Sequence, residues 1–141
     1  MKNLKQRLSE LKLKSEDDLD TLNSILEEIK AADYPKDFIL PLLHVLECNP
    51  NFDFGTPGYL VSTIEKISVK FTNEEYFDVL IQSVERVPME YNLWLMNRMM
   101  NTFEDKSQIK KGLTVFQKVK QETANVGLCG LVQRFIERFD K

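Results

Sequence analysis

Two stretches decide the fold: Phe54-Gly-Thr-Pro-Gly-Tyr-Leu-Val-Ser-Thr-Ile-Glu65 and Asn92-Leu-Trp-Leu-Met-Asn-Arg-Met-Met-Asn101. In the first, a glycine-bounded turn leads into a helix. Thr56 is a typical N-cap residue, and Pro57 suits the first helical position. Apolar residues then recur at the helical positions 60, 61, 64 and 67. The second stretch is a dense apolar helix that also carries Asn and Arg at regular positions, and Pro88 is expected to start it.

The rest of the chain shows the same helical periodicity, and no segment alternates with period two for long. Helices are expected to begin near residues 15, 34–40, 56, 73, 88, 105 and 125. We therefore predict an all-α protein with a single domain, 1–141, of about seven helices. The intervals suit antiparallel helical hairpins of 35–40 residues in a HEAT-like arrangement, and an irregular helical bundle is the alternative. Residues 1–14 form either a basic arm or a short helix.

Residues 34–48 are apolar on nearly every side, which predicts a central buried helix. Pro41 does not suit the interior of that helix. Either the helix kinks there, or a turn over residues 35–39 precedes a helix that begins near Leu40. We favour the second interpretation.

The composition is typical of a soluble globular protein, with 43% hydrophobic and 29% charged residues. No apolar run approaches the roughly 20 residues of a membrane-spanning helix, and the first residues lack the apolar core of a signal peptide. We therefore expect a cytoplasmic location and no membrane partner. In that setting Cys48 and Cys129 are expected to be two buried free thiols.

The net charge of −3 conceals a strong segregation of charge along the chain. Residues 15–55 carry ten acidic and two basic side chains, whereas residues 106–141 carry eight basic and three acidic ones. An acidic middle disfavours nucleic-acid binding. It favours a basic protein partner through electrostatic steering. Solvated helix faces would account for the same pattern without any partner.

No catalytic, metal or cofactor site is predicted. His44 is the only histidine. It could share a helix face with Cys48, but two ligands on one helix do not complete a zinc site. A packed histidine is the simpler interpretation. The Gly55–Gly58 turn lacks the Gly-Lys-Ser/Thr ending of a phosphate loop. The acidic pairs fall at helix starts or on polar faces, where they stabilise the helix dipole or face solvent.

Trp94, Asn97, Arg98 and Asn101 are spaced i, i+3, i+4 and i+7, so they form one stripe on a helix. Trp and Arg are common in binding hot spots. Asn and Arg could instead bond to loop carbonyls and fix neighbouring helix ends, since buried polar groups need partners. We favour the structural role.

The pattern Phe54-Gly-Thr-Pro-Gly-Tyr-Leu-Val-x-x-Ile-Glu65, followed by Val87-Pro-x-x-x-x-Leu-Trp-Leu-Met-Asn-Arg-x-x-Asn101, resembles small bacterial immunity proteins. These are encoded beside polymorphic toxins, including those of contact-dependent growth inhibition systems. The resemblance covers residues 35–103. The motif residues are expected to be structural: Gly55, Pro57, Gly58, Trp94, Asn97, Arg98 and Asn101.

The resemblance implies an all-helical cytoplasmic antitoxin without enzymatic activity, which binds the toxin domain of a delivered effector. Such toxins are frequently nucleases, whose active sites tend to be basic, and an acidic inhibitor surface would complement them. The candidate toxin-binding residues come from charge and expected exposure alone: Asp17, Asp18, Asp20, Asp33, Asp37 and Asp53. The alternative function is a helical-repeat scaffold or regulator that binds another protein partner.

Overall fold

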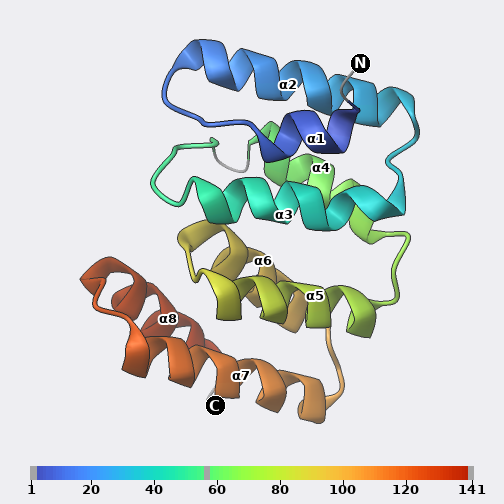
Figure 1. The fold of residues 1–141 in the computed structure, drawn as a ribbon. Helices are drawn as coiled ribbons and strands as arrows, with labels where there is room; N and C mark the ends of the chain where they lie inside the picture. Colours follow the sequence, from blue (N-terminus) through green and yellow to red (C-terminus); the bar gives the residue numbers. More distant parts are fainter. Residues whose placement is uncertain (1–2, 56–57, 140–141) are drawn as a thin grey trace. The chain divides into compact units, whose positions relative to one another are not determined.

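A computed structural model describes residues 3–55 and 58–139 (Figure 1). All the regular secondary structure in these two ranges is helical, which confirms the all-α prediction. It consists of eight α-helices and one 3-10 helix: α1 (Leu4–Ser9), α2 (Glu16–Ala31), η1 (Lys36–Phe38), α3 (Ile39–Cys48), α4 (Tyr59–Ser68), α5 (Asn73–Arg86), α6 (Glu90–Met100), α7 (Lys106–Glu122) and α8 (Val126–Phe139).

The chain divides into two compact units, unit 1 (Met1–Thr72) and unit 2 (Asn73–Lys141). In unit 1, α1 packs against α3, and α2 packs against α4. In unit 2, α5 packs against α7, and α6 packs against α8. Each unit therefore stacks one pair of consecutive helices on the next pair. This is the packing that a helical repeat requires, whereas the HEAT-like architecture of the whole chain stays a prediction.

The start of α2 is fixed by a capping box. Ser15 accepts a hydrogen bond from the Asp18 N–H, and the Asp18 carboxylate accepts from the Ser15 N–H at 3.2 Å. The box thus satisfies two backbone donors that have no partner inside the helix. Leu22, Ile25, Leu26 and Ile29 follow on the buried side of α2. The N-cap and the regular apolar face that the sequence predicts are therefore both present in α2.

Residues 35–48 follow the second of the two interpretations. A 3-10 turn over Lys36–Phe38 precedes α3, which begins at Ile39. Pro41 then lies in the first turn of α3, where a backbone N–H has no helical partner to lose. The expectation of a central buried helix is met on one side only, because Leu40, His44 and Cys48 are exposed. They are spaced four residues apart, so a single face of α3 remains uncovered.

Two glycines shape the turn before α4. Gly55 and Gly58 have φ angles of 96° and 83°, a region that L side chains rarely adopt. A Cβ on Gly58 would lie 1.9 Å from the backbone oxygen of Phe54. The expected helix start at residue 56 is wrong: Gly58 is the N-cap and α4 begins at Tyr59, because an extended Gly58 cannot belong to the helix. Thr56, the predicted N-cap, and Pro57 lie outside the described residues.

The connection between α5 and α6 is held by Asn92. Its side-chain oxygen accepts from the Met89 N–H at 2.9 Å, and its amide donates to Val87 O at 2.8 Å and to Ser83 Oγ at 3.1 Å. The prediction that Pro88 starts this helix is wrong. Met89 is still extended, with φ −151° and ψ 167°, so α6 begins at Glu90.

In the part of the chain that the structure describes, no helix has both the length and the apolar character needed to cross a bilayer.

Candidate binding surfaces

The six candidate aspartates do not form one patch. Asp17, Asp18 and Asp20 lie in the first turns of α2, whereas Asp33 and Asp37 lie in the connection from α2 to α3. Figure 1 shows these two places at opposite ends of α2, a helix of 16 residues that spans about 24 Å. The six residues therefore fall into two separate groups, one at each end of α2.

Asp53 belongs to the first of these ends. It lies in the loop between α3 and α4, which starts beside the segment before α2, because the Leu13 N–H donates to Asn49 Oδ1 at 3.1 Å. In Figure 1 this loop and the start of α2 lie at the same end of unit 1. We call Asp17, Asp18, Asp20 and Asp53 the acidic end of unit 1.

Four of the candidate carboxylates already have partners within unit 1. The Asp18 carboxylate serves the capping box, and Asp53 Oδ1 accepts from the Gly55 N–H at 2.9 Å. Asp37 forms an ion pair with Lys5, and the hydrogen bond from Lys5 lowers the pKa of Asp37. The Asp33 carboxylate lies 3.9 Å from Lys70 Nζ. These contacts give all four a structural role in the free protein.

Asp17 and Asp20 are different. Both are exposed, and among the described residues their carboxylates make no hydrogen bond or ion pair. Glu16 is also exposed and precedes them directly. Three neighbouring negative charges with two free carboxylates can attract a basic partner without first breaking an internal contact. The free charge of the acidic end thus concentrates at the start of α2.

The stripe on α6 is divided between the surface and the interior. Asn97 is buried, whereas Arg98 and Asn101 are exposed. Trp94 retains 42% exposure and packs edge-on against Phe135 of α8, with ring centroids 4.9 Å apart. The aromatic part of the stripe therefore helps to join α6 to α8.

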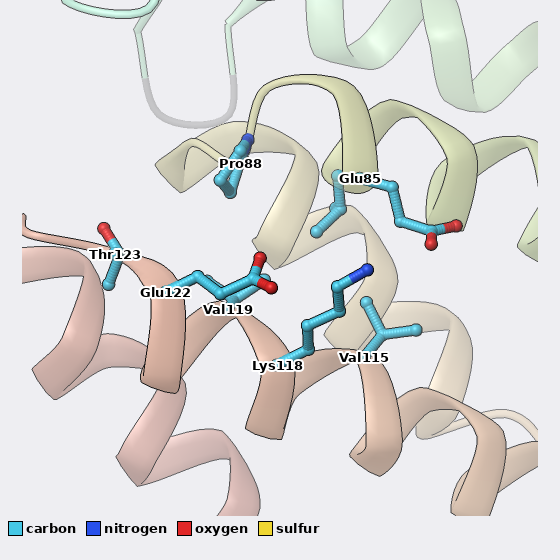
Figure 2. Close-up of a pocket in the computed structure, with 8 residues that line it drawn as sticks. Glu85, Pro88, Val115, Lys118, Val119, Glu122 and Thr123 are labelled. Carbon is cyan, nitrogen blue, oxygen red and sulfur yellow. The ribbon is translucent and has the colours of Figure 1, made fainter.

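Unit 2 contains a pocket that sequence reasoning did not find (Figure 2). It has a volume of about 250 Å³ and lies between the end of α5, the following loop and the second half of α7. Its apolar lining comes from Val84, Pro88, Val115 and Val119. The pocket is smaller than the roughly 300–1,000 Å³ typical of small-molecule sites, so its size suits a single side chain better than a metabolite.

Three charged residues surround this apolar lining: Glu85 from α5, and Lys118 and Glu122 from α7. Figure 2 shows the Lys118 amine directed from α7 toward α5 and the Glu122 carboxylate directed toward Lys118. All three side chains are exposed, and none makes an ion pair or hydrogen bond within the described ranges. Only the i, i+4 spacing of Lys118 and Glu122 was visible in the sequence; the meeting of α5 with α7 depends on tertiary packing.

A second hollow, of about 410 Å³, lies where α7 turns into α8. Its lining includes Thr123, Val126 and Cys129. The charged residue in its lining, Lys120, already donates a hydrogen bond to Gln133 Oε1. This hollow therefore presents no free charge to select a ligand.

The His44 and Cys48 side chains are in direct contact. His44 Nε2 lies 3.3 Å from Cys48 Sγ, and both side chains are exposed. The prediction of a packed histidine is therefore wrong, as is that of a buried Cys48, because both residues lie on the uncovered face of α3. Cys129 is half-buried, and both thiols are free. Over residues 3–55 and 58–139, no three His, Cys, Asp or Glu side chains are grouped so that they could hold a metal ion.

Comparison with protein-family models, with curated proteins and with solved structures gives no match for this chain.

Proposed function

We propose that this chain is an immunity protein that binds and neutralises a cognate toxin domain of the nuclease type, by covering its active site or substrate channel. The observation that carries the proposal is the acidic end of unit 1, where the Asp17 and Asp20 carboxylates are exposed and free of internal partners. A nuclease must attract phosphates, so its active site offers basic groups that this surface would complement.

Two further features support the proposal. The motifs at 54–65 and 87–101 resemble those of small immunity proteins, and the glycines of the first motif form a strained turn. Because these motif residues have a structural role, the partner-binding surface is expected at other positions. An antitoxin of this kind would act in the cytoplasm, where it meets the delivered toxin.

The test is coexpression with the toxin domain encoded by the adjacent upstream gene. We expect restored growth and a one-to-one complex that co-purifies. Without rescue and without a complex, the proposed function is wrong.

A charge-reversal variant then tests the surface. In Asp17→Lys/Asp20→Lys, the association rate should fall by about tenfold at low salt, and the difference should shrink at high salt because the attraction is screened. The matched control is Glu104→Lys/Glu137→Lys, which makes the same change in net charge in unit 2. Equal association rates for the two variants would reject the acidic end as the toxin surface while leaving the immunity function intact.

The stacked hairpins in each unit favour one second candidate, a helical-repeat scaffold or regulator for another protein partner. The same coexpression experiment separates the two functions, because a scaffold would not protect cells from the toxin.

A further inference from the structure

We infer that the pocket between α5 and α7 is an anchor site for an arginine side chain of a protein partner. The inference rests on the proposed function only for the identity of that partner. The preference of the pocket for arginine follows from its own lining and charges.

The apolar part of the pocket selects a side chain with a hydrocarbon stem. Val84 and Val119 are buried, and Pro88 and Val115 are half-buried beside them. Long cationic side chains lay their methylene groups along such surfaces and keep the charged head at the edge. With a volume of about 250 Å³, the pocket has room for one such stem.

The charges around the pocket select a cation. Two carboxylates, Glu85 and Glu122, and one ammonium, Lys118, belong to the lining of the pocket. A partner that covers the pocket removes water from these groups, and a desolvated carboxylate without a counter-charge is costly. A neutral occupant would leave one negative charge uncompensated, and an anionic occupant would add another. A cationic occupant balances the site.

Guanidinium suits this site better than ammonium. It is planar, so it can stack over the apolar lining and still donate two parallel hydrogen bonds to one carboxylate. Glu122 is the carboxylate best placed for this contact, because Figure 2 shows it directed toward Lys118 among the lining residues. Lys118 remains as the counter-charge of the second carboxylate, Glu85, so the occupied site is neutral.

The inference is tested on the full chain without any toxin. The probe is N-acetyl-arginine methylamide, titrated into protein with isotope-labelled valine methyl groups and followed by NMR. We expect saturable shifts of the Val84, Val115 and Val119 methyl resonances, with a Kd of about 1 mM for so small a ligand. N-acetyl-citrulline methylamide has nearly the same shape without the charge, and it should bind at least about fivefold more weakly.

Two variants complete the experiment. Glu122→Gln should abolish most of the preference for arginine over citrulline, whereas the exposed Glu104→Gln should leave it unchanged. The inference is overturned if the valine methyls do not saturate, if citrulline binds equally well, or if Glu122→Gln keeps the full preference. Because no toxin is present, a failed coexpression cannot be mistaken for failure of the pocket, nor the reverse.

Discussion

Replacement of Gly58 by alanine should destabilise unit 1 strongly. Gly58 has φ 83° and ψ 159°, a conformation essentially restricted to glycine. Such a residue costs of order 1–3 kcal/mol when it carries a side chain. The new Cβ would also lie 1.9 Å from the Phe54 backbone oxygen, a clash that only a backbone shift can relieve. The lower entropy of the unfolded alanine chain offsets about 0.4–1 kcal/mol. The backbone shift that relieves the clash adds about 1–3 kcal/mol, so from the middle of each range we expect a net loss of about 2–4 kcal/mol.

The assay is urea unfolding followed by circular dichroism at 222 nm. With an m-value of about 1.5 kcal/mol/M, the midpoint of Gly58→Ala should fall by about 1.3–2.7 M. The control is Gly130→Ala in α8, where the nearest atom to a new Cβ is 3.9 Å away. There the higher helix propensity of alanine should stabilise the protein by about 0.5–1 kcal/mol. If the Gly58→Ala midpoint lies within about 0.3 M of wild type, the strained-turn argument is wrong.

Three other predictions follow from contacts described above. Asn92→Ala removes two buried hydrogen bonds and one part-buried one and should cost about 2–3 kcal/mol in the same urea assay, and an unchanged midpoint would show that the contacts are dispensable. The hydrogen bond to Glu27 raises the pKa of Tyr59 to about 12. This contact stabilises the fold fully below pH 10 and is lost as the pH rises from about 10 to 12, so a spectrophotometric titration should show one late tyrosine that titrates earlier in Glu27→Gln. Cys48 is exposed and Cys129 is half-buried, so a disulfide reagent should modify Cys48 first, and Cys48→Ser should remove the fast phase.

The sequence predicted the helices well where a local signal is decisive. The Ser15–Asp18 box and the periodic apolar face after it are properties of neighbouring residues, and both appear in α2. Pro41 was also interpreted correctly, because a proline in the first helical turn loses no hydrogen bond.

Two helix starts were misplaced for one reason. In both cases the rule that proline occupies the first helical position was decisive, but a specific contact holds the backbone extended at Gly58 and at Met89. At Gly58 this contact is the tight turn with Phe54, and at Met89 it is the hydrogen bond to Asn92. A local propensity is a weak guide where a specific contact fixes the backbone.

The candidate surfaces were harder to predict, since exposure and pairing depend on which helices meet. The sequence could not show that Lys5 reaches Asp37 or that Lys70 reaches Asp33, each more than 30 residues away. The pocket between α5 and α7 was hidden for the same reason, as was the uncovered face of α3.

The pairing of helices within unit 1 also bears on how the protein is made. Helices α1 to α4 find packing partners within the first 72 residues. All of these contacts close within 72 residues, and the entropic cost of closure grows only slowly with loop length. Domains generally fold as they emerge during translation. Unit 1, with its acidic end, can therefore reach its folded form on the ribosome before synthesis of α8 is complete.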